Sequence, residues 1–250
     1  MRFALFIFLA VVFNSGMLLG AEPNWDNYSR LLERHVSSGK IDGIYLNVVD
    51  YEAIKDDPRW PKVVSQLETF PPEQLESRNE KIAFYINAYN ILAIKMVIDH
   101  WPLKSIKDAG NLFSPVWEKP AGKISGKLVS LDDIEHKTLR PMRDPRVHMA
   151  IVCASISCPD LRREAYLAAH INEQLDNQSS VFLANRAKGF RMEDDQMRMS
   201  KIFDWFEEDF DNMGGVSAFV ARYQPGFPLK ESTKATLPYN WNLNYYSHDI

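Results

Sequence analysis

The chain contains 250 residues, of which 46% are hydrophobic and 25% are charged, and its net charge is −4. This balance is typical of a folded globular protein and excludes a disordered chain, a collagen-like repeat and a polytopic membrane protein. A chain with net negative charge does not favour nucleic-acid recognition, which normally needs a basic surface, so we expect no nucleic-acid partner. Two cysteines are too few for a disulfide scaffold.

The first 21 residues differ in composition from the rest of the chain. Arg2 precedes an apolar run over residues 3–13, and small residues follow. This pattern predicts a secretory signal peptide over residues 1–21 with cleavage near Ala21; an uncleaved anchor extending to Leu19 is the alternative. We therefore expect one domain over residues 22–250 that is periplasmic or secreted and has no stable membrane span after cleavage.

The longest predicted helix covers residues 78–99 and follows a helical region that opens at residues 71–73. Its apolar side chains lie on nearly every face, which is typical of a buried central helix. Asn87 and Asn90 project from one stripe of this helix, where an unpaired amide costs about 1–3 kcal/mol. Their amides either make structural hydrogen bonds to a neighbouring loop or orient a segment that contacts ligand.

A second helix of interest is predicted over residues 130–140. Ser130 is a good N-cap because an acidic residue follows three positions later. Glu135 falls on the inward face and His136 at its edge, so the carboxylate requires a partner. In one interpretation Glu135 forms a structural ion pair with Arg140 or Arg146. In the other, Glu135 is a functional carboxylate whose pKa is shifted by its surroundings.

Residues 146–153 form an apolar run that predicts a buried strand ending at Cys153. A cysteine at a strand end near a histidine can act as a thiolate nucleophile. On an extended strand His148 lies on the opposite face from Cys153, so these two cannot form a dyad; a chain that folds back could bring Cys158 near His148, and the sequence leaves both pairings open. His136 belongs to a different predicted element, so it can contact Cys153 only if the tertiary fold brings the two together.

The two cysteines also allow a purely structural interpretation. A disulfide between Cys153 and Cys158 would close a short loop and suits an oxidising compartment. Neither a C-x-x-C motif nor a Cys/His spacing typical of zinc is present, so we expect no metal and no cofactor. The remaining histidines are treated as surface or packing residues.

The other predicted elements are short and alternate between helix and strand. In chain order they are a helix within residues 24–39, a strand or extended segment over 41–51, a hairpin within 116–129, a helix within 167–187, a hairpin over 190–199, and helices over 202–210 and 216–223. The aromatic stripes on these elements are interpreted as core.

Four motifs in the same order resemble the domain of unknown function 547 family. They are NEKIAFYINAYN at residues 79–90, SLDDIEH with Leu-Arg at 130–140, RVHMAIVCASISCP at 146–159, and LPYNWNLN at 237–244. The family is remotely similar to papain-like and transglutaminase-like cysteine hydrolases. That resemblance implies an α+β fold with a central helix packed on a mainly antiparallel sheet.

The resemblance also implies roles for individual residues. Cys153 would be the nucleophile, His136 the base, and Glu135 or Glu80 the supporting carboxylate. The chain departs from the papain pattern because the cysteine follows the histidines.

Two functional hypotheses follow. The first is a thiol-dependent hydrolase for amide or peptide-like small substrates. The second is a non-catalytic envelope module that binds a small-molecule or peptide-like ligand and carries a structural disulfide. The candidate binding residues are Asn87, Asn90, Arg140, Arg146, His148, Ser155 and Cys158. The oligomeric state stays open.

Overall fold

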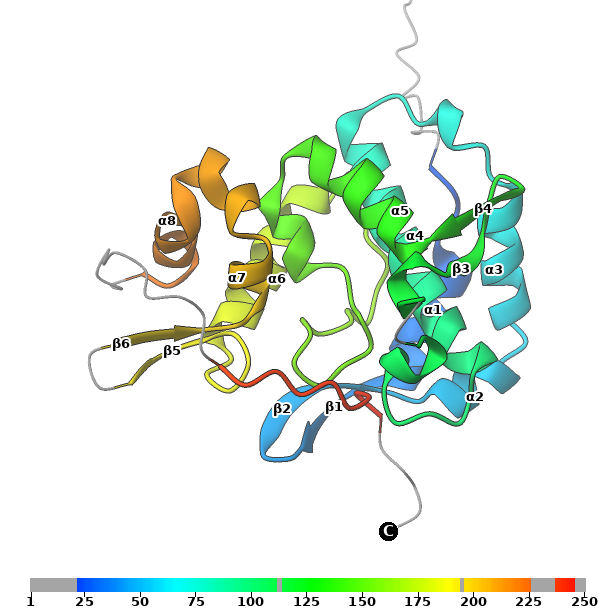
Figure 1. The fold of residues 1–250 in the computed structure, drawn as a ribbon. Helices are drawn as coiled ribbons and strands as arrows, with labels where there is room; N and C mark the ends of the chain where they lie inside the picture. Colours follow the sequence, from blue (N-terminus) through cyan, green and yellow to red (C-terminus); the bar gives the residue numbers. More distant parts are fainter. Residues whose placement is uncertain (1–21, 112–113, 194–195, 226–236, 246–250) are drawn as a thin grey trace, which may run out of the picture.

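The computed structural model describes residues 22–111, 114–193, 196–225 and 237–245 (Figure 1). The predicted signal peptide lies outside these residues. The α-helices within them are α1 (Asp26–His35), α2 (Tyr51–Asp56), α3 (Trp60–Thr69), α4 (Arg78–Asp99), α5 (Leu131–Ile134), α6 (Ile171–Ala184), α7 (Ile202–Trp205) and α8 (Gly215–Tyr223). The strands are β1 (Val36–Ile41), β2 (Ile44–Val49), β3 (Pro120–Ile124), β4 (Lys127–Ser130), β5 (Phe190–Glu193) and β6 (Gln196–Met199).

Helix α4 is the buried central helix that the sequence predicts. Its first turn is closed by a capping box, in which the Ser77 hydroxyl accepts from the Glu80 N–H and the Glu80 carboxylate accepts from the Ser77 N–H. Among the described residues, α4 is the one helix long and apolar enough to cross a membrane, but 83% of its most apolar window is buried inside the protein. It is therefore a core helix.

The strands pair as antiparallel hairpins, β1 with β2, β3 with β4 and β5 with β6. The α+β class is confirmed, although within the described ranges the strands form separate two-stranded sheets and not one continuous sheet. Asp42 and Gly43 between β1 and β2, and Ser125 and Gly126 between β3 and β4, all have positive φ. Two successive residues with positive φ suit the tight turns that match strand twist.

The hydrophobic core has two main clusters, and Figure 1 shows the elements around them as two groups. The larger cluster surrounds α4 and includes side chains of α1, α3 and the β3–β4 hairpin. The smaller cluster is rich in phenylalanine and joins parts of α6, α7, α8 and the β5–β6 hairpin. The C-terminal segment 237–245 runs beneath both groups in this view.

The strand predicted over residues 146–153 is wrong. Residues Pro145–Met149 form a 3-10 helix, which Pro145 begins and Asp144 caps by accepting from the Arg146 N–H. Proline suits a first helical turn because its missing N–H needs no partner there. Local capping therefore outweighs the apolar pattern, and the chain is irregular from residue 150 to residue 170, where α6 follows.

Two predicted helices are broken into shorter pieces. The helix expected over residues 130–140 begins as α5 and continues as a π-helical turn, Glu135–Leu139. The helix expected over residues 202–210 divides into α7 and a 3-10 segment, Glu207–Met213. Single π-helical turns occur frequently at functional sites, and this one carries Glu135 and His136.

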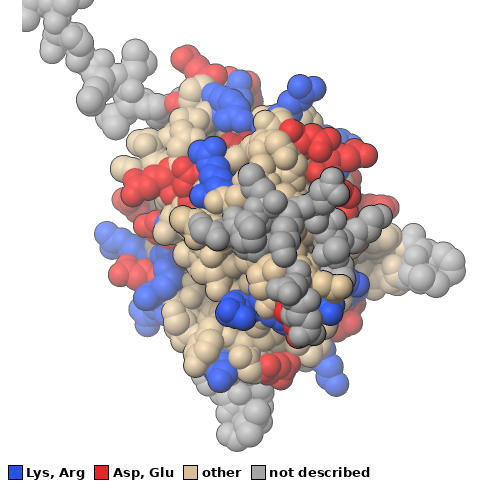
Figure 2. All heavy atoms as spheres, turned by 90° about the vertical axis from the view of Figure 1, so that its left-hand side faces the viewer, with Lys and Arg blue, Asp and Glu red and all other residues tan. Residues whose placement is uncertain are grey.

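The surface seen in Figure 2, which presents the left-hand side of Figure 1, mixes both signs of charge. Lysine and arginine side chains are interspersed there with aspartate and glutamate. On this face no broad single-sign field is available to attract a polyanion.

Candidate functional site

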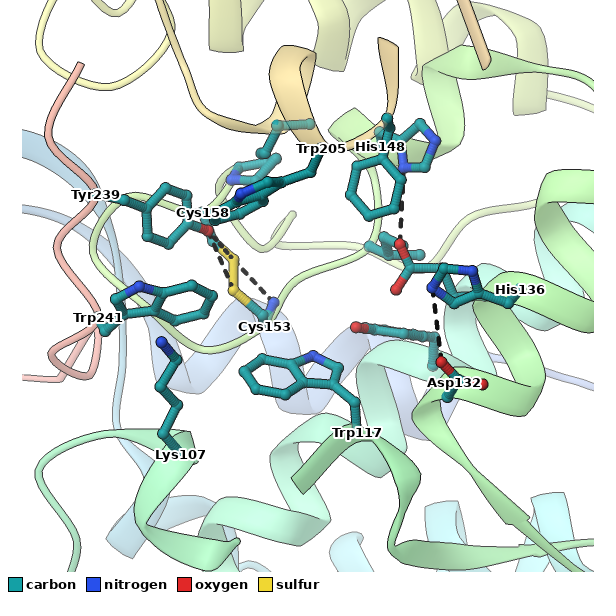
Figure 3. A pocket seen from close by; sticks show the side chains of 16 residues that line it. Lys107, Trp117, Asp132, His136, His148, Cys153, Cys158, Trp205, Tyr239 and Trp241 are labelled. Atoms are coloured by element: carbon teal, nitrogen blue, oxygen red, sulfur yellow. Dashed lines mark hydrogen bonds and ion pairs between the residues drawn. A yellow bond between two sulfur atoms is a disulfide. The ribbon is translucent and has the colours of Figure 1, made fainter. Parts of the chain in front are cut away.

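A pocket of about 330 Å³ opens between the two core clusters, and Figure 3 shows its lining. Aromatic rings and the Cys153–Cys158 disulfide form one side, while acidic and imidazole side chains form the other. The lining residues are Tyr89, Lys107, Trp117, Asp132, Glu135, His136, His148, Ile151, Cys153, Cys158, Pro159, Ile202, Trp205, Phe206, Tyr239 and Trp241. The disulfide loop, the π-helical turn, α7 and the C-terminal segment thus meet at one place.

The sulfurs of Cys153 and Cys158 are bonded to each other, with their Cα atoms 6.1 Å apart. Neither cysteine is free, so the structure has the disulfide that the sequence left as the alternative to a thiolate nucleophile. A thiolate nucleophile requires an ionisable thiol, and the disulfide removes it. The predicted roles of Cys153 as nucleophile and His136 as its base are therefore not available in this state of the protein.

Buried polar groups hold the chain that carries the disulfide. The Asn90 amide donates to the Ala150 carbonyl at 3.0 Å and accepts from the Val152 N–H at 2.8 Å, which positions the residues just before Cys153. On the far side of the loop, the Lys188 ammonium donates to the Cys158 carbonyl at 2.7 Å. Both halves of the loop are thus tied to the core.

The C-terminal segment brings two aromatic residues to the disulfide. Ser155 forms an antiparallel bridge with Leu243, and the N–H of Ser157 donates to the Asn240 carbonyl. This pairing places Tyr239 and Trp241 with their ring centroids 4.5 Å apart. The motif at residues 237–244 therefore supplies a wall of the pocket.

Further rings complete the aromatic wall around Trp241. Its ring stacks with that of Trp205 at a centroid distance of 5.6 Å and meets the Trp117 ring edge-on at 5.5 Å. The Lys107 ammonium lies 3.6 Å from the centroid of the Trp241 ring, which is a cation–π contact. Trp205 is still 44% exposed, so this wall faces solvent at its rim.

The opposite wall holds a buried carboxyl group and a buried imidazole. Glu135 is 6% exposed and His148 is 2% exposed. The His148 Nε2 lies 2.7 Å from Asp209 Oδ2, and its Nδ1 lies 3.8 Å from Glu135 Oε1. Since the ionised Asp209 only accepts, Nε2 carries the proton and Nδ1 presents its lone pair toward Glu135.

The pKa values of these two groups are shifted by the pocket. Burial raises the pKa of Glu135 to about 7, although the nearby Arg140 charge and a hydrogen bond from Tyr89 oppose this rise. Burial lowers the pKa of His148, and the hydrogen bond to Asp209 only partly compensates. Near neutral pH the wall therefore presents a half-protonated carboxyl group and a neutral imidazole.

Arg140 joins the polar groups but does not pair with Glu135 by hydrogen bonds. Its guanidinium donates to both carboxylate oxygens of Asp209, at 2.6 and 3.0 Å, and to the His136 Nδ1 at 2.7 Å. His136 thus accepts at Nδ1 and directs Nε2 toward Asp132, 3.6 Å away. The predicted partner Arg146 instead pairs with Asp144 and Asp176, away from this pocket.

Two other predicted site residues have structural roles. Glu80 belongs to the capping box of α4 and does not line the pocket, so the structure does not bring it together with the other predicted catalytic residues. The Asn87 amide donates to the Tyr166 carbonyl and accepts from the Tyr166 N–H, at 2.8 and 2.9 Å. Asn87 therefore fits the structural alternative, whereas Asn90 orients the loop that carries Cys153.

The sequence reasoning missed the aromatic residues of the pocket. Phe206 belongs to a stripe interpreted as core, and Tyr239 and Trp241 appeared only inside a family motif. Asp209 carried no local signal because its partners, Arg140 and His148, are more than sixty residues away. Among the residues that the structure describes, no cluster of three or more His, Cys, Asp or Glu could hold a metal ion.

The fold and the pocket define a mixed domain of helices and hairpins with a disulfide in the wall of an aromatic pocket. Residues 72–183 match the model of the family described as "Protein of unknown function, DUF547", and this segment belongs to that family. It contains α4, the π-helical turn and both cysteines, while the motif at residues 237–244 lies beyond it. No curated protein and no solved structure matches the chain. The likeness to papain stays a prediction.

Proposed function

We propose that the protein is a non-catalytic ligand-binding module of the cell envelope. The observation that carries this proposal is the pocket of about 330 Å³, whose wall contains the Cys153–Cys158 disulfide. Small-molecule sites are mostly apolar clefts with a few convergent polar groups, and this pocket has that composition. The disulfide supports binding over the thiol-dependent hydrolase, because hydrolysis by Cys153 needs a thiolate.

The two walls indicate the chemistry of the ligand. The rings of Trp117, Trp205 and Trp241 offer flat surfaces for an apolar or aromatic group. Opposite them, Asp132 and Glu135 can accept hydrogen bonds from an amide or an amine. We therefore propose a small peptide-like ligand that has an aromatic or bulky apolar group beside an amide.

The cellular location is part of the same proposal. The signal-like composition of residues 1–21 and a disulfide in the pocket wall both favour an oxidising compartment. We propose a mature chain of residues 22–250 that is periplasmic or secreted. Fractionation of cells and sequencing of the mature N-terminus test this, and a cytosolic protein that retains residue 1 contradicts it.

Binding is tested with N-acetylated amino-acid amides as probes. The probes carry the side chains of phenylalanine, leucine and alanine, and each is titrated against the oxidised protein while tryptophan fluorescence is recorded. We expect saturable quenching that is strongest with the aromatic side chain, because this group stacks with the rings of the pocket. Equal responses to all three probes, or no saturation with any, would overturn the proposed ligand class.

A pair of variants assigns the signal to the pocket. Trp241→Ala removes the central ring of the aromatic wall, and we expect it to weaken binding of the phenylalanine probe by about 5- to 150-fold, since stacking and burial contribute about 1–3 kcal/mol. Tyr45→Ala is the matched control, because Tyr45 is an aromatic residue that is 69% exposed and does not line the pocket. Equal affinities of the two variants would place the binding site elsewhere.

A further inference from the structure

The two sulfurs of the disulfide have different surroundings. Both cysteines line the pocket, but Cys158 is 3% exposed whereas Cys153 is only partly buried. An incoming nucleophile that enters the pocket therefore meets the sulfur of Cys153 first. Access decides which sulfur of a disulfide is attacked.

A backbone donor distinguishes the two sulfurs. The N–H of Cys153 donates to the Cys158 Sγ at 3.0 Å. The Tyr239 hydroxyl lies 3.3 Å from both sulfurs, and the Ser155 hydroxyl lies 3.2 Å from the Cys153 Sγ. The fixed N–H stabilises an anion on Cys158, and the Tyr239 hydroxyl can add a second donor, so Cys158 is favoured as the sulfur that leaves as a thiolate.

We propose that this disulfide is an exchange site for low-molecular-weight thiols, which attack Cys153 and release Cys158. The thiol first loses its proton to solvent, and its thiolate sulfur bonds to the Cys153 Sγ. The bond between the two cysteine sulfurs breaks, and its electron pair leaves on the Cys158 Sγ. The product is a mixed disulfide on Cys153 and a Cys158 thiolate held by the Cys153 N–H and by Tyr239.

A second thiol molecule completes the exchange. Its thiolate attacks the sulfur of the bound thiol, which releases the symmetrical small disulfide and leaves Cys153 as a thiolate. In sum, two thiols are oxidised to one disulfide while the protein disulfide is reduced to two cysteines. This activity goes beyond ligand binding, which is a property of the oxidised pocket.

The first test identifies the attacked sulfur. The oxidised full chain is incubated with 2-mercaptoethanol, quenched in acid at intervals, unfolded, treated with N-ethylmaleimide and mapped by peptide mass spectrometry. We expect early time points to show 2-mercaptoethanol on Cys153 and the maleimide on Cys158. The reverse assignment, an equal mixture, or no adduct at thiol concentrations that fully reduce the unfolded chain would overturn the proposal.

The second test addresses the leaving group. Tyr239→Phe keeps the ring but removes the hydroxyl that faces Cys158, and we expect exchange about tenfold slower because one hydrogen bond to the developing thiolate is lost. Tyr45→Phe is the matched control and keeps the wild-type rate. Equal rates for Tyr239→Phe and wild type would exclude the role of Tyr239.

Thermal melting of both oxidised variants verifies that their folds are intact. Probe binding is measured separately on oxidised protein, so failure of either proposal is distinguishable from failure of the other.

Discussion

Asn87 and Asn90 each take the place of a missing backbone partner. An asparagine amide has a carbonyl oxygen and an NH₂ group, so it can bond to the N–H and C=O of a passing segment in the way that a neighbouring strand does. Asn87 serves Tyr166 in this way, and Asn90 serves the segment from Ala150 to Val152. The two amides thereby fix irregular chain against a helix.

Substitution of Asn87 tests this role. Asn87→Ala leaves the Tyr166 N–H and carbonyl unpaired at a site where Asn87 is 0% exposed, so we expect the free energy of unfolding to fall by about 1–3 kcal/mol. Urea denaturation of the variant and wild type measures the difference. Asn27→Ala on α1, where the side chain is half-exposed, is the control with an expected change below about 0.5 kcal/mol. A small effect of Asn87→Ala would show that water replaces the amide.

Glu135 provides a pH-dependent test at the scale of one residue. Its folded-state pKa of about 7 lies above the ordinary value of 4.5, so the folded protein holds this proton more tightly than the unfolded chain does. The stabilising effect of that proton is therefore complete below pH 4.5 and is lost as the pH rises to about 7. Glu135→Gln does not ionise, so the variant does not lose this stability as the pH rises.

We expect Glu135→Gln to gain about 3 kcal/mol of stability relative to wild type between pH 4 and pH 8. Urea denaturation of both proteins at pH 4, 6 and 8 measures the change in their difference, in which the other titrating groups cancel. A difference that does not vary with pH would mean that Glu135 ionises with an ordinary pKa, and the buried acid of the pocket wall would then be ruled out.

At the scale of elements, the disulfide loop depends on a buried lysine that follows α6. Lys188 is 2% exposed, and its ammonium lies 2.6 Å from the Asp160 carboxylate as well as 2.7 Å from the Cys158 carbonyl. The same Asp160 accepts from the N–H of Asn47 on β2. This ion pair therefore ties the loop to the β1–β2 hairpin and to the turn after α6.

Lys188→Met is expected to destabilise the fold by about 1–3 kcal/mol, because it leaves the partly buried Asp160 carboxylate and the Cys158 carbonyl without their donor. The double variant Lys188→Met with Asp160→Asn removes both charges and should recover part of the loss. Thermal and urea denaturation of the single and double variants measure this coupling. Additive effects of the two substitutions would show that the pair contributes no coupling energy.

At the scale of the whole molecule, one carboxylate joins the two core clusters. Asp209 lies beside Phe210 of the smaller cluster, and it accepts from Arg140 and His148, whose neighbours Leu139 and Val147 belong to the larger cluster. Burial opposes ionisation of Asp209, but the hydrogen bonds from His148 and Arg140 outweigh it and hold its pKa well below the ordinary value. The pocket lies at this junction.

Asp209→Asn tests the junction. At pH 7 we expect a loss of about 2–4 kcal/mol, because the Arg140 charge and the His148 N–H lose their acceptor. Since the folded-state pKa is depressed, the contribution of Asp209 is present above the unfolded pKa and is lost as the pH falls through the folded value. Urea denaturation of both proteins at pH 7 and pH 3 should therefore show a smaller difference at pH 3. Glu193→Gln is the control. Glu193 forms exposed ion pairs with Arg191 and Arg198, so we expect little effect on stability.

Helix α4, the cap at Ser130 and the β3–β4 hairpin were predictable because their signals are local. The period of apolar residues, a Ser followed three residues later by an acidic residue, and a glycine in a tight turn each act within a few residues. The apolar run at residues 146–153 gave a wrong prediction because its local pattern does not show what pairs with its backbone. The Asn90 side chain bonds to Ala150 and Val152 in place of a neighbouring strand.

By itself, the sequence determined the α+β class, the central helix and the family resemblance, because hydrophobic periodicity and motif order are written along the chain. Only the tertiary structure decided that Cys153 and Cys158 are joined, that Glu80 caps a helix, and that Trp241 faces the disulfide. The physical reason is that the state of a thiol or a carboxyl group depends on which distant groups surround it. Burial of Glu135 and contact of Asp209 with Arg140 arise from residues far apart in sequence, and packing alone brings them together.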